Sequence, residues 1–305
     1  ARHAGSSFYM SLWMLPPTQR QALFALYAFA RHTDDIADDE DSPAHATDSR
    51  SAALQTWRTA LHETLARRDE RIAARADATE FSYLPALADS ARRYSIPSAH
   101  FESLIDGVTR DLDARDFPDF PALKIYCEQV ASSVGLACMH IWTDHPQTAY
   151  PAATECGIAF QLTNILRDLR EDAQRDRLYV PLDLLDELKL PRDELFRIVR
   201  EGRHDRRYEL LIERMSDVAE RAYRVGWETR QALRGRSRRC FELMFHTYHQ
   251  LLDKIRKSPY AAAQRRLRLS RPHKAWIALT TLCGVPPRFA ATRESNNDFH
   301  KADAP

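Results

Sequence analysis

Four residues of one predicted helix place a phenol, a guanidinium and two carboxylates on the same face. Tyr27, Arg31, Asp34 and Asp38 follow one another at steps of three and four residues, a spacing that keeps side chains on one side of an α-helix. The acids also lie near the predicted C-terminus of the helix, where the helix dipole disfavours negative charge by roughly 0.3–1 kcal/mol. A bound cation would reverse that penalty, so this stripe indicates a site for a cation.

A second stripe with similar spacing carries amides as well as acids. Gln161, Asn164, Asp168 and Asp172 come directly after an apolar segment, Cys156–Phe160. Amides among apolar neighbours need a hydrogen-bond or ligand partner when they are buried. Two such stripes facing each other in a helical bundle would form a cage for hard divalent cations, and those cations bind phosphates.

Part of the acidic sequence has an ordinary explanation. Six of the eight residues from 34 to 41 are Asp or Glu. Asp39–Asp41 is interpreted as a solvated helix end, which is often acidic. That explanation fits Asp34 and Asp38 less well, because they continue the stripe that begins at Tyr27.

The elements that position these stripes are predicted to be helices. Only 8 of 305 residues are glycine, and 44% are hydrophobic, a composition that suits long helices. Apolar spacing and start and stop signals predict helices over residues 16–39, 51–68, 81–94, 96–113, 123–142, 152–172, 182–188, 192–201, 208–233, 240–257 and 272–283. We predict one all-α domain over residues 1–290, followed by a disordered polar tail over residues 291–305.

Charge and cysteine content narrow the class of protein further. The net charge of +1 gives no strong bias toward nucleic acid, and the five cysteines include no C-x-x-C pair. They are interpreted as free thiols in a reducing compartment. No apolar stretch approaches the roughly 20 residues of a membrane span, and no signal peptide is recognised. We therefore expect a cytoplasmic protein.

Three stretches resemble motifs of the squalene/phytoene synthase family. Ala25–Asp38, with Ser7-Phe8-Tyr9 upstream, resembles the first aspartate-rich motif. Residues 161–172, with Arg-Leu-Tyr-Val-Pro at 177–181, resemble the second. Tyr126–Gly135 is similar to the central helix signature, except that Ser132-Ser133 stands where the family often has glycine. The resemblance covers roughly residues 5–285.

The resemblance implies the isoprenoid-synthase fold, an all-α bundle around a cavity lined with Mg²⁺ ligands, and a prenyltransferase activity. Two or three Mg²⁺ ions would be held by Asp34, Asp38, Asn164, Asp168 and Asp172. The four aspartates and Tyr27 are expected to be catalytic. Substrate contacts are expected from Ser7, Phe8, Tyr27, Arg31, Gln161, Arg167, Tyr179 and Tyr248. Tyrosines at such spacing are also ordinary half-buried core residues.

The same resemblance implies head-to-head (1′–1) condensation of two prenyl diphosphates. The motifs are closer to bacterial squalene-pathway members than to plant-type phytoene synthases. They favour farnesyl diphosphate as substrate and presqualene diphosphate or squalene as product, with NADPH used only for squalene. The alternatives are phytoene from geranylgeranyl diphosphate, dehydrosqualene, and a catalytically silent assembly subunit. The pathways concerned are hopanoid and carotenoid biosynthesis.

A basic region counterbalances the acids. Thirteen Lys or Arg and only two acids lie between Arg230 and Lys274. The run Arg234–Arg239 is interpreted as a solvated connection between helices. The alternative is docking to anionic lipid, which would place the protein peripherally on the inner face of a membrane. No motif for nucleic-acid recognition is present.

Overall fold

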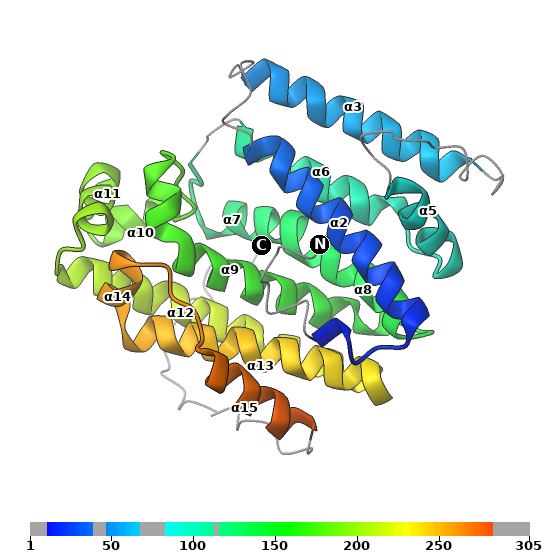
Figure 1. Ribbon diagram of the computed structural model, residues 1–305. Helices are drawn as coiled ribbons and strands as arrows, with labels where there is room; N and C mark the ends of the chain where they lie inside the picture. The colour runs from blue at the N-terminus through cyan, green and yellow to red at the C-terminus, as the bar shows by residue number, and fades with distance from the viewer. Residues whose placement is uncertain (1–10, 39–46, 68–82, 113–115, 283–305) are drawn as a thin grey trace, which may run out of the picture.

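The computed structural model describes residues 11–38, 47–67, 83–112 and 116–282, and these contain helices and no strand (Figure 1). The all-α prediction is therefore confirmed. The elements before the central helix are α2 (Pro17–Asp38), α3 (Thr47–Ala66), α5 (Leu84–Arg93), α6 (Ser98–Leu112), α7 (Phe120–Cys127), the π-helical η1 (Glu128–Ser132), α8 (Ser133–Trp142) and the 3₁₀ turn η2 (Pro146–Ala149). They are followed by α9 (Tyr150–Gln174), α10 (Leu182–Glu187), α11 (Arg192–Glu201), α12 (Arg206–Gly226), the 3₁₀ segment η3 (Trp227–Ala232), α13 (Gly235–Lys257), α14 (Pro259–Gln264) and α15 (Arg271–Leu282).

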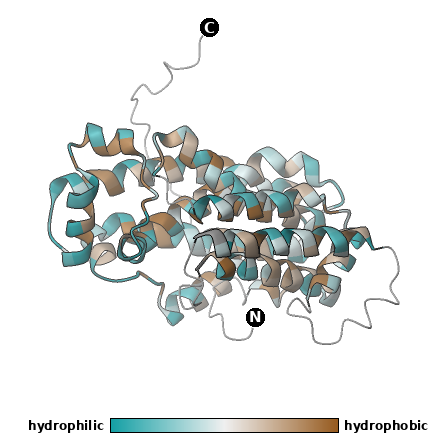
Figure 2. Cartoon of the chain, turned by 90° about the horizontal axis from the view of Figure 1, so that it is seen from above, coloured by the Kyte–Doolittle hydropathy of each residue, from teal (hydrophilic) through white to brown (hydrophobic). Residues whose placement is uncertain are grey.

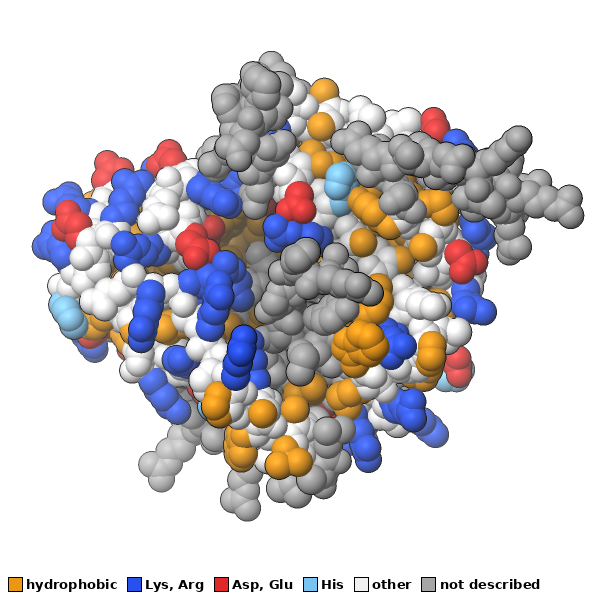
Figure 3. All heavy atoms as spheres, viewed as in Figure 1, with side chains coloured by type: hydrophobic (Ala, Val, Ile, Leu, Met, Phe, Trp, Pro, Cys, Tyr) orange, Lys and Arg blue, Asp and Glu red, His pale blue; other side chains and the backbone are white. Residues whose placement is uncertain are grey.

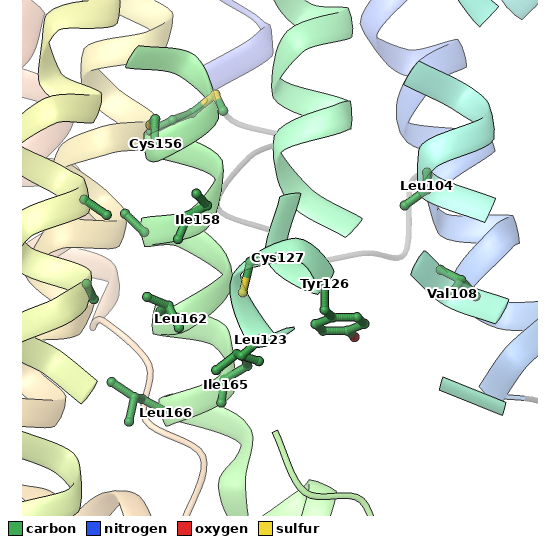
Figure 4. Close-up of a cluster of buried hydrophobic side chains, with 14 of the residues drawn as sticks. Leu104, Val108, Leu123, Tyr126, Cys127, Cys156, Ile158, Leu162, Ile165 and Leu166 are labelled. Atoms are coloured by element: carbon green, nitrogen blue, oxygen red, sulfur yellow. The ribbon is translucent and has the colours of Figure 1, made fainter. Parts of the chain in front are cut away.

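Helix α9 lies at the centre of the bundle and packs against helices on several sides, including α12, α8, α11 and α13. A helix enclosed in this way must be apolar around most of its circumference. Figure 4 shows Leu162, Ile165 and Leu166 of α9 in one buried cluster with Leu123 and Cys127 of α7. The polar residues of α9 are therefore exceptions that need another explanation.

The surrounding helices are amphipathic. In Figure 2 several of them carry hydrophobic residues on one side and hydrophilic residues on the other. In α2 the buried side includes Phe29, whose ring stacks on Trp57 of α3 at 5.4 Å between centroids. At the start of α2, Gln19 Nε2 donates to the carbonyl of Ile141 at 2.8 Å. Helix α2 is thereby fixed to the C-terminal end of α8.

The long helix predicted over residues 123–142 is interrupted by the π-helical turn η1. The extra bulk of this turn fits because glycines face it from both sides. A Cβ atom on Gly157 of α9 would lie 2.5 Å from Ser132 Cα, and one on Gly107 of α6 would lie 2.6 Å from Val130 Cγ1. Ser132 is itself small, and its hydroxyl donates to the carbonyl of Thr154 at 2.7 Å. This contact explains why a small residue stands at 132.

One helix boundary and one short helix also differ from the sequence prediction. The run Arg234–Arg239 is not a connection, because α13 begins at Gly235. Arg238 pairs with Glu242 one turn later at 2.8 Å, and Ser237 and Cys240 are buried. This ion pair and this burial both stabilise the helical conformation of the stretch. The short helix α14 was not predicted. The proposed tail from residue 291 lies outside the described residues.

Across the described ranges, no helix is both long and apolar enough to cross a membrane. Four of the five cysteines fall within these ranges, and all four are free and buried: Cys127, Cys138, Cys156 and Cys240. Burial raises the pKa of each of these thiols.

The contact at Gly157 predicts a stability effect. Gly157→Ala should lower the free energy of unfolding by about 1–3 kcal/mol, because the new methyl group overlaps the backbone of η1. Gly135→Ala is the matched control, since a Cβ there would lie 3.8 Å from its nearest neighbour, the carbonyl oxygen of Ala153. Urea unfolding of both variants measures this free energy. Equal values for the two variants would contradict the prediction, because they would show that η1 shifts to accommodate the methyl group.

Buried histidines predict a loss of stability in acid. Burial, with a smaller effect of nearby His249, lowers the pKa of His246 to about 4, and burial, with His140 nearby, lowers that of His100 to about 4. Between pH about 6.5 and 4 the unfolded chain therefore binds more protons, and folding free energy is lost as the pH falls. The melting temperature should drop between pH 7 and pH 5. His246→Phe should flatten that drop, whereas His145→Phe, at an exposed position, should not.

Candidate active site

The described residues line a cavity of about 320 Å³ between α2, η1, α8, α9, η3 and α13. One end is apolar and includes Leu23 and Ala153; the other carries Asp34 and Asn164. Leu23 and Asp34 are eleven positions apart on α2, and Ala153 and Asn164 are eleven positions apart on α9, which is about 16 Å of helix in each case. The cavity is therefore elongated, with its oxygen donors together at one end.

The stripe on α9 reaches the cavity through its two amides. Gln161 and Asn164 both line the cavity, and Asn164 Nδ2 lies 3.4 Å from Gln161 Oε1. The Oδ1 atom of Asn164 is buried and accepts no hydrogen bond. A buried acceptor without a donor costs free energy, so this oxygen is suited to a ligand.

The acids of the α9 stripe lie in the two turns after Asn164. Arg167 Nε donates to Asp168 Oδ1 at 2.8 Å, and Arg266 Nε lies 2.9 Å from the same atom. Asp172 is in a more negative environment: burial first, and then the charges of Asp168, Asp111 and Glu171, raise its pKa to about 8, although Arg177 opposes the shift. Additional positive charge is favourable at this point.

The stripe on α2 lies across the same end of the cavity. Tyr27 and Asp34 line it, and burial raises the pKa of Tyr27. Arg31 pairs with Asp35 at 2.7 Å, and both side chains are about half exposed. Asp38 is the last residue of α2, and its side chain lies outside the description.

Arg177 connects the ends of the two helices that carry the stripes. Its guanidinium donates to the carbonyl of Ala37 in the last turn of α2 at 3.4 Å. Its charge also lowers the pKa of Asp172 near the end of α9. The final turns of the two helices are therefore neighbours, although their acids are far apart in sequence.

Tyr248 of α13 closes the side of the cavity. Its ring stacks on Phe160 with centroids 4.5 Å apart, and both residues line the cavity. Burial raises the pKa of Tyr248, while hydrogen bonds with Arg167 and Asn164 act in the opposite direction. The hydroxyl is thereby held beside the polar end.

A carboxylate that the sequence analysis missed lies next to this site. Asp111 of α6 accepts hydrogen bonds from the hydroxyls of Tyr126 and Tyr179, each at 3.0 Å, and the two rings stack at 5.3 Å. Asp111 also raises the pKa of Asp172. An acid in the last turn of a predicted helix, the signal used for Asp34, would have identified it.

Some predicted site residues are not at the cavity wall. Ser7 and Phe8 lie outside the described residues. Tyr179 bonds to Asp111 and does not line the cavity. Phe160, the last residue of the apolar segment before the α9 stripe, is at the cavity wall, whereas Phe29 and Phe245 are fully buried core residues.

The donor set fits a hard cation that brings other ligands with it. In the ranges that the structure describes, no three His, Cys, Asp or Glu side chains converge into an ion site of their own. Mg²⁺ requires no such cage, because it takes one or two carboxylates and completes its shell with water and phosphate oxygens. The unbonded oxygen of Asn164 and the negative surroundings of Asp172 both favour such an ion.

Comparisons with known proteins agree with this arrangement. A family model described as squalene/phytoene synthase matches residues 1–273. A phytoene synthase from Mycobacterium tuberculosis is 34% identical over 283 residues, covering 92% of this chain and 87% of the relative. A presqualene diphosphate synthase from Sinorhizobium fredii is 30% identical over 278 residues, covering 90% and 91% of the two chains.

Solved structures show the same fold. A dehydrosqualene synthase in complex with a ligand superposes with a TM-score of 0.76 at 24% identity, covering 93% of each chain. A squalene synthase from Alicyclobacillus acidocaldarius gives a TM-score of 0.69 at 22% identity, covering 87% of this chain and 91% of that one.

The chain therefore belongs to the squalene/phytoene synthase family, and the expected isoprenoid-synthase fold is confirmed. Members of this family are prenyltransferases that act on prenyl diphosphates and generally use Mg²⁺. The expected enzyme class is thereby confirmed as well.

The negative surroundings of Asp172 predict opposite effects with and without metal. Without metal, Asp172→Asn should leave the melting temperature unchanged or raise it, because it removes one of several neighbouring negative charges. With Mg²⁺ and inorganic diphosphate, wild type should melt higher and the variant should not. Asp35→Asn, at the exposed pair with Arg31, should behave like wild type. A full response to Mg²⁺ in Asp172→Asn would remove this residue from the site.

Proposed function

We propose that this chain joins two farnesyl diphosphate molecules head to head, giving presqualene diphosphate and, when NADPH is supplied, squalene. The observation that carries the proposal is one elongated cavity with an apolar wall and with Asp34 and Asn164 at one end. A prenyl diphosphate has the same division, an apolar chain that ends in phosphate oxygens.

The polar end would hold the diphosphates. We propose that two or three Mg²⁺ ions are held by Asp34, Asp38, Asn164, Asp168 and Asp172. When bound, Mg²⁺ acts as a Lewis acid that draws negative charge from a departing diphosphate. Arg31 and Arg167 would donate to phosphate oxygens, a role that suits the planar guanidinium. Ser7 and Gln161 are proposed to complete the contacts around the substrate, and Tyr179, which is bonded to Asp111 outside the cavity wall, would have to turn from that bond to join them.

The apolar part of the cavity would protect the reaction from water. In the reaction, one allylic C–O bond breaks and the diphosphate leaves with the electron pair. The double bond of the second substrate attacks the resulting cation, and loss of a proton closes a cyclopropane ring. Water would capture such a cation, so an apolar wall is required. The faces of Phe160 and Tyr248, and of Phe8 as predicted from sequence, would stabilise the cation.

Two other products come from the same chemistry. Geranylgeranyl diphosphate would give phytoene, and a proton loss in place of hydride transfer would give dehydrosqualene from farnesyl diphosphate. The relatives carry the names phytoene synthase and presqualene diphosphate synthase, so their names do not select one substrate. The C15 substrate is favoured by the sequence motifs alone.

The silent-subunit alternative is disfavoured by the site. A protein that had lost catalysis would have no need to keep an unbonded amide oxygen at Asn164 or to surround Asp172 with like charge. Both features cost free energy in the protein by itself.

Mass spectrometry of the products tests the substrate and the reaction together. Purified protein with Mg²⁺ is given farnesyl or geranylgeranyl diphosphate, each with and without NADPH. We expect a C30 product from farnesyl diphosphate, as presqualene diphosphate without NADPH and squalene with it. Asp34→Ala, which removes an oxygen donor from the polar end, should reduce turnover by at least about a hundredfold. A C40 product alone would overturn the choice of substrate, and no product from either would favour the silent subunit.

We also propose peripheral contact with the anionic inner face of a membrane. The proposed product is a hydrocarbon, and the region between Arg230 and Lys274 is strongly basic.

A further inference from the structure

Helix α15 has an apolar stripe on its outer face as well as on its inner face. Pro272, Ala275, Trp276 and Leu279 are all exposed, and their spacing places them on one side of the helix. The opposite side carries Ile277, which is fully buried against the protein. A helix that only covers a protein core needs one apolar stripe, so the outer stripe needs another partner.

A neighbouring segment enlarges this apolar surface. Met14 packs against the cluster that contains Leu243 of α13 and Ile277 of α15, so residues 11–15 lie beside α15. Trp13 in that segment is 55% exposed, and Trp276 and Leu279 are 50% and 61% exposed. Figure 3 shows hydrophobic side chains gathered over the lower part of this face, where α15 lies in Figure 1. We call Trp13 and the outer stripe of α15 the docking face.

Large exposed hydrophobic residues are concentrated on the docking face. In the described ranges five large hydrophobic side chains are exposed, and three of them are Trp13, Trp276 and Leu279. The other two, Ile125 and Val225, lie on α7 and α12. Single exposed hydrophobics are common on proteins, but three on two neighbouring segments indicate an interaction surface.

The surroundings of the docking face are basic. No Asp or Glu occurs from residue 254 to residue 282. Arg268 and Arg271 are exposed and form no ion pair with a described carboxylate, and Lys274 follows one turn later. Burial, and then the charge of Arg268, lower the pKa of Lys274, so these cations are close enough to repel one another. The guanidinium of Arg20 lies 4.5 Å from the ring centroid of Trp13. An anionic partner would relieve this repulsion.

The docking face lies next to the apolar part of the cavity. Leu12 lines the cavity, whereas Met14, two residues later, contacts the α15 cluster. On α13, Met244 lines the cavity and the adjacent Leu243 packs against α15. The segment 11–15 and helix α13 therefore each contribute residues both to the cavity wall and to the α15 cluster.

We infer that the docking face binds the surface of an anionic phospholipid bilayer. The tryptophans and Leu279 would enter the boundary between head groups and acyl chains, where such side chains are favoured, and Arg268, Arg271 and Lys274 would contact the lipid phosphates. The inference rests on the proposed function in one respect, because a hydrocarbon product gives the contact its purpose. It assigns membrane contact to the C-terminal part of the basic region, not to Arg234–Arg239.

Co-sedimentation with lipid vesicles tests the inference on the full chain. Vesicles of phosphatidylcholine with 30% phosphatidylglycerol, about one lipid in three and so strongly anionic, are compared with pure phosphatidylcholine. We expect binding to the anionic vesicles that weakens in 1 M salt, where the Debye length falls to about 3 Å. Trp276→Ser with Leu279→Ser should weaken binding by at least about tenfold, since it removes two large apolar side chains.

Two further variants separate charge from general surface effects. Arg268→Gln with Arg271→Gln should weaken binding by about thirtyfold, because each basic residue near an anionic surface contributes about a factor of five. Ile125→Ser with Val225→Ser is the matched control, because these residues are 50% and 49% exposed but lie elsewhere. Equal binding by wild type and the Trp276/Leu279 variant would overturn the inference, and so would a loss of binding in the matched control alone.

Sedimentation velocity without lipid tests whether a second copy of the chain covers the docking face instead of a membrane. If wild type is a dimer and Trp276→Ser with Leu279→Ser is a monomer, a second copy covers the face and the inference fails. Turnover of substrate dissolved in detergent should be the same in both proteins, because Trp276 and Leu279 do not line the cavity. Vesicle binding without turnover of any prenyl diphosphate would contradict the proposed function and leave the docking face intact.

Discussion

Several carboxylates lie close together at the C-terminal ends of buried helices, and most of the site depends on how their charge is balanced. The ionised form of such acids is disfavoured by burial, by the neighbouring negative charges and by the helix dipoles. Asp168 is neutralised by Arg167 and Arg266, but Asp172 keeps a pKa of about 8 despite Arg177. The protein thus balances only part of the charge. In the proposed function, the remainder would draw a cation and its phosphates to this end of the cavity.

The unusual packing around the central helix serves the same site. The π-helical turn η1 contributes Val130 to the cavity wall and is held between Gly107 and Gly157. π-helical turns are rare and often occur at functional sites. Here the turn is tolerated because neighbouring helices carry glycine where a side chain would collide. Close packing on one side of η1 and a cavity on the other allow α9 to be both a core helix and a wall of the site.

The cavity runs from a charged end to an apolar end. Asp34 and Asn164 mark the charged end, and the apolar part of the wall includes Leu12, next to the docking face. A substrate with a charged head and an apolar tail has one favourable orientation in such a cavity. The same gradient would direct an apolar product toward the docking face.

Local spacing in the sequence was enough to determine the helices and the two acidic stripes, because the apolar period and the helix end signals are read within a few turns of chain. It did not determine the π-helical turn, which depends on glycines about 20 residues or more away. Nor did it bring Asp111 to Tyr126 and Tyr179, or Arg266 to Asp168, since contacts between distant segments have no local signature. The apolar spacing of α15 predicted a helix but not which face would be covered. Only the tertiary structure decided that, because burial depends on which elements pack against each side.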